Sequence, residues 1–236
     1  NNPFAMIKIY CKMINLDYEL ISLKDLKKKK IKKDSAMYIA NPNGFDGLCS
    51  NISNITNKFK FAIIDEVYAD FYSKSSLNLL KKFDKLIIIR TFSKTAGYPG
   101  LKVGFSISGE KIFKAMNSLR LSVEHSSYVI NKCIKLLKSN SIKNNQKIIK
   151  NTIYWGRKNF LKINIDSLTR TIIWFTIDLK QKKLKKKVID KFKAKNIFVY
   201  HKFNKDFDTL ISFTASHLNN FKYIFNLIKS VNTKLK

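Results

Sequence analysis

The stretch that decides the fold is Phe61-Ala-Ile-Ile-Asp-Glu-Val-Tyr68, together with Leu86-Ile-Ile-Ile-Arg-Thr-Phe-Ser-Lys94. In each segment a short apolar run, rich in β-branched residues, is followed at once by polar side chains. Such runs are typical of strands in a sheet that is covered on both faces. The amphipathic segment Ser75–Phe83 lies between them and predicts a helical crossover, which would make the two strands parallel. Their polar residues would then meet at the sheet edge where open α/β folds bind ligands.

Two more apolar runs of the same kind, Ala36–Ala40 and Val103–Ser108, extend the predicted sheet. The residues before them predict a helix over 4–14 and a strand over Tyr18–Ser22. After residue 110 the pattern becomes helical. The helices expected there are Lys111–Arg120, Tyr128–Lys138 and Ser141–Lys162.

The rest of the chain alternates between strand and helix patterns and predicts a small α+β unit. Its expected elements are the strands Thr171–Asp178, Ile197–Tyr200 and Leu210–Phe213 and the helices Lys183–Lys195 and Leu218–Val231. We therefore predict an α/β protein with a large domain over residues 1–160, built on a mainly parallel sheet, and a small domain over residues 161–236. The boundary is expected within the long helix.

Composition excludes several classes of protein. The 236 residues are 45% hydrophobic and 13% aromatic, which supports a sizeable core and argues against disordered, collagen-like and coiled-coil chains. No apolar run approaches the length of a membrane-spanning helix. Three cysteines without a CxxC motif and three scattered histidines argue against a disulfide framework and a metal centre. We expect a soluble, cytoplasmic protein with no metal and no membrane partner.

The formal charge of +30 raises the possibility of nucleic-acid binding. However, only four of the 46 basic residues are Arg, the residue that bidentate recognition of phosphates and bases prefers. The abundant Lys, Ile and Asn residues share A/T-rich codons, so nucleotide bias explains much of the excess. We predict that the charge is spread over the surface and that no nucleic acid is bound specifically.

Three polar motifs follow predicted strands: Asn41-Pro-Asn-Gly-Phe-Asp-Gly47, Asp65-Glu-Val-Tyr68 and Thr91-Phe-Ser-Lys94. Each has a purely structural interpretation, because an Asp at a strand end often caps a helix and Asn-Pro or Ser-Lys stretches often form turns. Asp65 and Lys94 nevertheless each follow an apolar run, and one strand–helix–strand excursion separates them. If the strands are parallel neighbours, the carboxylate and the amine converge at one edge.

In this order and spacing the motifs resemble fold-type I pyridoxal-phosphate (PLP) enzymes of aminotransferase class I/II, most closely histidinol-phosphate aminotransferases. The resemblance is most specific at Ile64–Tyr68, at Thr91–Lys94 and at Gly100-Leu-Lys-Val-Gly-Phe105. It implies a PLP-transferase-like fold, with residues 1–160 as the large PLP-binding domain and residues 161–236 as the small C-terminal domain. Relatives carry a long segment before the equivalent of Asn1, so we expect an N-terminally incomplete chain.

The resemblance also implies an activity. We expect a PLP-dependent transaminase that moves an amino group between an amine, amino-phosphate or amino acid and a keto acid, with both substrates small molecules and the full-length protein a homodimer. A PLP-dependent decarboxylase resembling threonine-phosphate decarboxylases shares the motifs and remains an alternative. A non-catalytic fragment is a third interpretation.

The resemblance gives a role to each motif residue. Lys94 would hold the coenzyme covalently and shuttle a proton during the reaction. Asp65 would pair with the nitrogen of the coenzyme ring and keep it protonated. Tyr68 would donate a hydrogen bond to the phenolic oxygen of the ring. The hydroxyls of Thr91 and Ser93 would lie at the coenzyme phosphate.

Five further positions carry a match or a departure from the pattern. Phe4 matches the aromatic residue that stacks on the coenzyme ring in relatives. Lys102 stands where relatives have an Arg on the phosphate, so that the bidentate fork is lost. Gly44 replaces the Asn that contacts the phenolic oxygen, and Asn43 is the nearest substitute. Leu210 stands where relatives anchor the substrate anion with Arg, which leaves the substrate class open.

Overall fold

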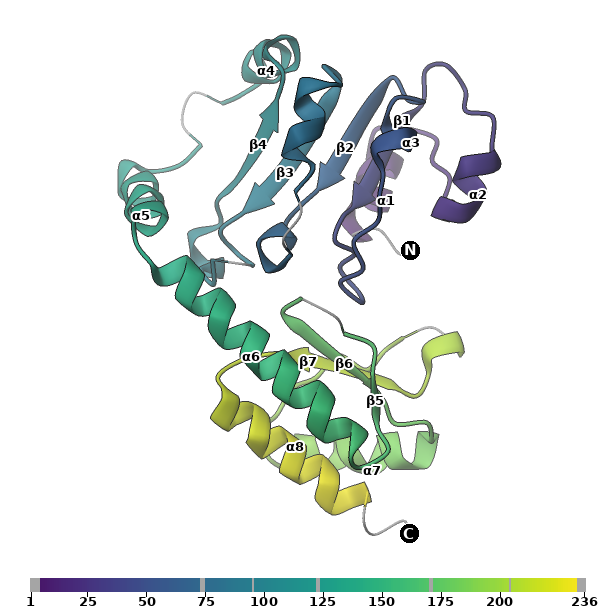
Figure 1. Cartoon of the computed structure of the whole chain (residues 1–236), viewed down its shortest axis with the longest axis vertical. Helices are drawn as coiled ribbons and strands as arrows, with labels where there is room; N and C mark the ends of the chain where they lie inside the picture. Colours follow the sequence, from purple (N-terminus) through teal and green to yellow (C-terminus); the bar gives the residue numbers. More distant parts are fainter. Residues whose placement is uncertain are drawn as a thin grey trace. The chain divides into compact units, whose positions relative to one another are not determined.

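The computed structural model describes residues 5–72, 75–94, 96–121, 124–169, 172–203 and 205–232. The chain divides into two compact units, Asn1–Ile142 and Lys143–Lys236 (Figure 1). The division falls inside the long helix α6 (Ser141–Leu161), ahead of the boundary expected near residue 160. Most of α6 belongs to the second unit because its buried residues, among them Phe160, pack on that unit's sheet.

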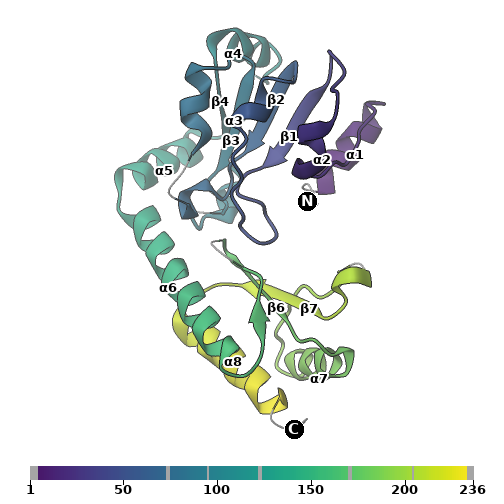
Figure 2. The ribbon, with the colours of Figure 1, turned by 45° about the vertical axis from the view of Figure 1, so that its right-hand side comes forward.

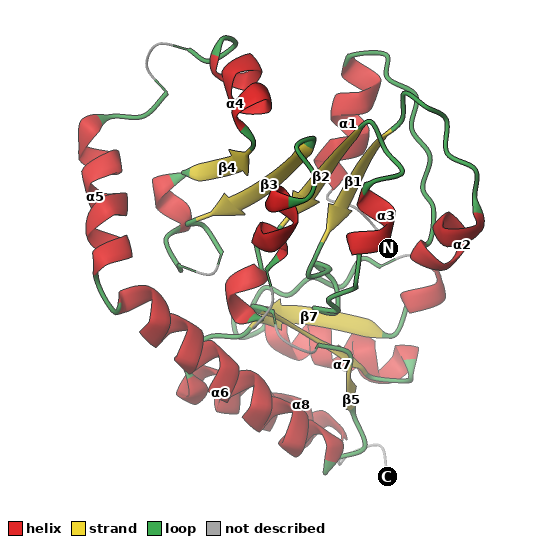
Figure 3. Ribbon diagram, turned by 45° about the horizontal axis from the view of Figure 1, so that its top comes forward, coloured by secondary structure: helices red, strands yellow, loops and turns green. Residues whose placement is uncertain are grey.

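The first unit is built on a four-stranded sheet in the order β1-β2-β3-β4, shown in yellow in Figure 3. Its strands are β1 (Ala36–Ala40), β2 (Phe61–Asp65), β3 (Leu86–Thr91) and β4 (Gly104–Ser108). The first three strands are parallel, which confirms the mainly parallel sheet. β4 runs antiparallel to β3, because the chain returns through a loop instead of a crossover helix.

Alternation along the strands gives this sheet two different faces. On one face Ile64 pairs with Ile88, and both are fully buried. Leu26 of α2 (Leu23–Lys28) and Ile55 of α3 (Ser53–Thr56) complete the core on that side. We call it the packed face. The other face, which we call the open face, carries half-buried side chains: Tyr38, Ile63, Asp65, Ile87, Ile89 and Thr91.

The helices of the first unit differ from the expectation in two places. α1 (Ala5–Met13), α4 (Glu110–Asn117) and α5 (Ser127–Lys138) lie where helices are expected. The crossover predicted over Ser75–Phe83 is a 3-10 helix, η2 (Ser76–Lys81), with two further 3-10 turns, η1 (Ala69–Phe71) and η3 (Pro99–Leu101). The strand predicted over Tyr18–Ser22 is wrong, because Ser22 instead caps α2 by accepting from the Asp25 N–H at 3.1 Å.

The second unit has a three-stranded antiparallel sheet in the order β5-β6-β7. Its elements are β5 (Asp166–Ser167), β6 (Trp174–Asp178), α7 (Lys182–Lys193), η4 (Lys205–Phe207), β7 (Leu210–Thr214) and α8 (Leu218–Asn232). The strand predicted over Ile197–Tyr200 is wrong, because only Tyr200 forms a bridge, to Ser212.

Aromatic rings fill the core of the second unit. Phe175 of β6 lies 5.4 Å from Phe160 and 4.9 Å from Phe221, measured between ring centroids. Gly156 lets α6 approach these rings, since an added Cβ would lie 2.6 Å from a Phe221 ring carbon. The helices α6 and α8 therefore pack side by side over the sheet (Figure 2).

Candidate active site

The two strands that carry the central motifs end at the same edge of the sheet. β2 and β3 are parallel neighbours, and Asp65 at the end of β2 pairs with Ile89. Thr91 ends β3 two residues later, on the same face as Ile89 and Asp65. The register therefore brings the Asp65 carboxylate and the Thr91–Lys94 turn to one edge on the open face.

The Asp65 carboxylate receives a hydrogen bond on each oxygen. The hydroxyl of Tyr38, on the neighbouring strand β1, donates to Oδ2 at 2.5 Å. The backbone N–H of Val67 donates to Oδ1 at 3.1 Å. Burial, followed by the hydrogen bond to Asp65 and the charge of that carboxylate, raises the pKa of Tyr38. The phenol therefore stays protonated and remains a donor.

The loop after β1 lies against Tyr68. An added Cβ on Gly44 would lie 3.3 Å from Cε2 of the Tyr68 ring, which is itself buried. The loop is tied to β2 by the Asn41 N–H, which donates to the Asp65 carbonyl at 2.9 Å. The side-chain oxygen of Asn43 accepts from the Phe45 N–H at 2.7 Å, so it stabilises the turn itself.

The turn after β3 is organised around the Thr91 hydroxyl. It donates to the Val103 carbonyl at 3.1 Å and accepts from the Ser93 N–H at 3.1 Å. Lys94 follows in this turn and is half-buried. Lys102 lies next to Val103, is exposed, and has a left-handed backbone with φ of 54°. Thr91 and Ser93 therefore lie in one turn, and the hydrogen bond from Thr91 to Val103 brings Lys102 next to it.

The packed face carries an ion-pair network directly behind the site. Glu66, whose side chain is 1% exposed, accepts from Arg90 Nη2 at 2.8 Å and from the Ser75 hydroxyl at 2.9 Å. Arg90 also contacts Asp70, with Nη1 to Oδ1 at 3.3 Å. Glu66 follows Asp65 and Arg90 precedes Thr91, so the network joins the ends of the two strands that carry the site.

The structure thus groups the predicted residues in two neighbouring sets. Asn43, Asp65 and Tyr68 form the first set, and the turn of Thr91, Ser93 and Lys94 with the adjacent Lys102 forms the second. The prediction for Phe4 lies outside the described residues.

Sequence reasoning missed Tyr38, Glu66 and Arg90. Two signals could have found them. Glu66 and Arg90 are charged residues directly next to the predicted site residues Asp65 and Thr91, and Tyr38 is the single aromatic residue in the strand β1. Alternation along the strand places Tyr38 on the face of Asp65.

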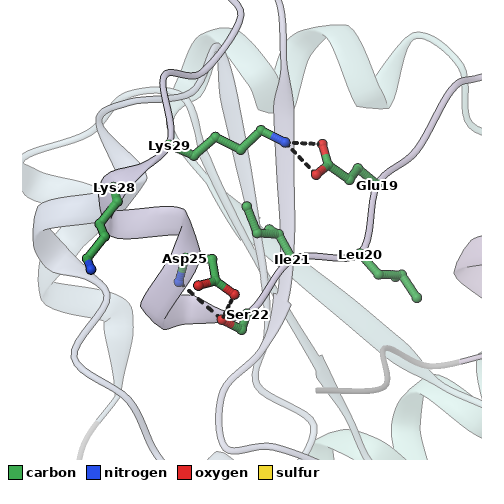
Figure 4. Close-up of a pocket in the computed structure, with 7 residues that line it drawn as sticks. All are labelled: Glu19, Leu20, Ile21, Ser22, Asp25, Lys28 and Lys29. Carbon is green, nitrogen blue, oxygen red and sulfur yellow. Dashed lines mark hydrogen bonds and ion pairs between the residues drawn. The ribbon is translucent and has the colours of Figure 1, made fainter.

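A depression beside α2 contains none of these residues (Figure 4). Its lining includes Lys29 and Glu19, which form an exposed ion pair of the kind that contributes little binding energy. Among the described residues no cluster of three His, Cys, Asp or Glu side chains could hold a metal ion. No helix within the described ranges is long and apolar enough to cross a membrane.

The position expected to anchor a substrate anion lies in the core of the second unit. Leu210 begins β7, pairs with Asp178 and is 3% exposed. A buried aliphatic side chain offers no charge to an anion. The Leu that stands here in place of the Arg of the family pattern therefore packs in the apolar core.

The fold and the site define an α/β protein whose polar residues gather at the carboxyl edge of a mainly parallel sheet. Residues 12–201 match the family aminotransferase class I and II, and the chain belongs to this family. It is 33% identical over 156 residues to the histidinol-phosphate aminotransferase of Brachyspira hyodysenteriae, an alignment that covers 62% of this chain and 44% of that protein.

Two solved structures have the same fold. The histidinol-phosphate aminotransferase of Sinorhizobium meliloti, in complex with pyridoxal-5'-phosphate, gives a TM-score of 0.75 at 16% identity over 85% of this chain and 58% of that one. The L-threonine-O-3-phosphate decarboxylase of Porphyromonas gingivalis gives a TM-score of 0.72 at 19% identity, over 98% of this chain and 74% of that one. The chain spans about half the length of the curated relatives it matches.

Proposed function

We propose that this protein acts as a PLP-dependent aminotransferase that transfers an amino group between a small amino donor and a keto acid. The observation that carries the proposal is the meeting of Asp65 and the Thr91–Lys94 turn at the carboxyl edge of the parallel strands β2 and β3. Family membership and the names of the relatives support the same activity.

The residues at this edge fit PLP. When bound, PLP supplies an aldehyde that takes up the amino group and a ring that withdraws electrons from the reacting carbon. The Asp65 carboxylate would pair with the ring nitrogen, since its oxygens retain lone pairs beyond those used by Tyr38 and Val67. The Lys94 amine would hold the coenzyme covalently and move the proton at the substrate Cα.

The remaining site residues would orient the coenzyme. Tyr68, positioned by the Gly44 loop, would donate to the phenolic oxygen, while Asn43 contributes through the shape of the turn. The Ser93 hydroxyl would provide a donor to the phosphate, with Lys102 as the nearby cation. Thr91 would shape the turn, because its own hydroxyl already donates to the Val103 carbonyl. A lysine attracts a phosphate as a point charge, without the bidentate geometry of Arg.

Leu210 limits the substrate class. Because this position is apolar and buried, a substrate anion would need another cation for its recognition. We therefore define the donor only as an amino acid, amine or amino-phosphate. Histidinol phosphate is the first donor to test, because the matched relatives carry its name.

A PLP-dependent decarboxylase is the second candidate. It is favoured by the Porphyromonas gingivalis decarboxylase, whose alignment covers 98% of this chain. The two activities leave different products, because a decarboxylase releases carbon dioxide and a transaminase produces a new keto acid.

We propose that the full-length protein is a cytoplasmic homodimer. The α4–α5 region exposes large apolar side chains: Phe113, Leu119, Leu121, Tyr128 and Leu137. Exposed apolar side chains of this kind fit a second copy of the chain. Cys11, Cys49 and Cys133 are thiols, which suits a reducing compartment.

The test uses the complete gene product alongside the present chain, both titrated with PLP and assayed with histidinol phosphate and 2-oxoglutarate. We expect a coenzyme absorption band and keto-acid formation without carbon dioxide. Lys94→Ala should lower turnover at least about 1000-fold. Lys186→Ala, on the exposed surface of α7, is the matched control and should retain full turnover.

Three results would change this proposal. Carbon dioxide release would favour the decarboxylase. A complete gene product that binds PLP without turning over any donor would support a non-catalytic protein. Full activity of Lys94→Ala would remove Lys94 from the mechanism.

A further inference from the structure

Tyr38 contacts the site but has no role in the function proposed above. It lies in the middle of β1 and pairs with Ile63 of β2, two residues before Asp65. Alternation places Tyr38, Ile63 and Asp65 on the open face. The phenol therefore reaches diagonally from β1 to the carboxylate on the neighbouring strand β2, and its hydroxyl donates to Oδ2 at 2.5 Å.

We propose that Tyr38 is a positioning residue for the coenzyme, acting through Asp65: its hydroxyl fixes the orientation of the carboxylate toward the nitrogen of the PLP ring. This inference rests on the proposed function. Tyr38 itself need not touch the coenzyme, and none of the residues expected from the family pattern performs this role.

The first reason is the strength of the contact. A hydrogen bond from a hydroxyl to a carboxylate is stronger than one between two neutral groups. A carboxylate held by such a bond would meet the ring nitrogen in one orientation, and a ring protonated at that nitrogen is a better acceptor of electrons.

The second reason is geometry. Val67 N–H holds Oδ1 and the Tyr38 hydroxyl holds Oδ2, so the plane of the carboxylate is fixed from both sides. Without the Tyr38 hydroxyl, the hydrogen bond from Val67 would be the one that remains of these two, and the carboxylate would rotate more freely. A group held in advance loses less entropy when it binds its partner.

The third reason is that the phenol is suited to be a permanent donor. Burial and the adjacent carboxylate raise the pKa of Tyr38, so that it keeps its proton. A Phe at this position would preserve the ring and its packing on the strand while removing only the donor. That makes Tyr38→Phe a narrow test of the hydroxyl.

The experiment compares the parent protein, Tyr38→Phe and the control Tyr72→Phe. The control removes a hydroxyl from another half-buried Tyr, which is not one of the two hydrogen-bond donors to the Asp65 carboxylate. PLP affinity is measured by absorbance titration of the complete gene product. PLP labelled with nitrogen-15 in the ring reports protonation of the ring nitrogen by NMR. We expect Tyr38→Phe to weaken PLP affinity about tenfold and to move the resonance toward that of neutral pyridine. Tyr72→Phe should change neither.

A double-mutant cycle separates action through Asp65 from simple packing. In the Asp65→Asn background, Tyr38→Phe should cause less than a twofold further loss of affinity. An equal loss in both backgrounds, or an unchanged resonance in Tyr38→Phe, would overturn the role of Tyr38 while leaving the proposed function intact. A parent protein that does not bind PLP would overturn both. Tyr38→His, which keeps a hydrogen-bond donor at this position, covers the case in which Tyr38→Phe fails to fold. It should retain part of the PLP affinity of the parent protein, and a complete loss of that affinity would overturn the role.

Discussion

The two faces of the first sheet differ in what their side chains do. The packed face buries Ile64, Leu86 and Ile88 completely and holds the Glu66–Arg90 ion pair. The open face carries Tyr38, Asp65 and the Thr91 turn, all half-buried. In Figure 1 the strands lie behind α3 and η2, which cover the packed face.

The difference shows how neighbouring residues divide two tasks. Asp65 and Glu66 are consecutive, as are Arg90 and Thr91, yet each pair sends its side chains to opposite faces. One member of each pair stabilises the strand ends, and the other faces the proposed coenzyme. The residues that stabilise the strand ends and those proposed to face the coenzyme are therefore neighbours in sequence.

The largest expected effect comes from the adjacent isoleucines of β3. Ile88→Ala removes a fully buried side chain from the packed face and should lower the free energy of unfolding by about 4 kcal/mol. Ile89→Ala, on the open face, should cost only about 1 kcal/mol because its side chain is half-buried. Urea denaturation measures both, and equal losses would contradict the division between the faces.

The next effect concerns the ion pair behind the site. Arg90→Ala leaves the Glu66 carboxylate buried without its cation and should cost about 3 kcal/mol. The control is Lys114→Ala, which breaks the exposed pair with Glu110 and should cause no measurable change. If Arg90→Ala is as stable as the parent, the network does not hold the strand ends together.

A smaller effect separates the two consecutive carboxylates. Glu66→Gln should lower the free energy of unfolding by about 2 kcal/mol and leave PLP affinity unchanged. Asp65→Asn should weaken PLP affinity about 100-fold and leave the free energy of unfolding almost unchanged. Both variants are compared by urea denaturation and PLP titration. A loss of PLP affinity in both would show that the two faces are coupled.

Much of the fold could be predicted from the sequence. The runs Ala36–Ala40, Phe61–Ile64 and Leu86–Arg90 match β1, β2 and β3 within one residue, because β-branched apolar runs have few alternatives in a covered sheet. Segments with weaker patterns failed. Ile197–Tyr200 is an apolar run like those of the strands, but its Phe198 side chain is 90% exposed and packs on no core.

The positions of the motif residues at the strand ends were also predictable, because each motif follows a strand whose end is well defined. Their partners were not. The contact of Tyr38 with Asp65 depends on the pairing register of two strands, and the burial of Glu66 depends on Arg90 arriving from a third. A one-residue slip in register would place these side chains on the wrong face, and no local pattern fixes it.

The central claim is that Lys94 holds the coenzyme, with Asp65 as its partner across the ring. The most direct measurement is borohydride reduction of the PLP-loaded complete gene product, followed by digestion and mass spectrometry of the labelled peptide. We predict a single phosphopyridoxyl label on the peptide that contains Lys94, and none in Lys94→Ala. A label on another lysine, with Lys94 unmodified, would contradict the account.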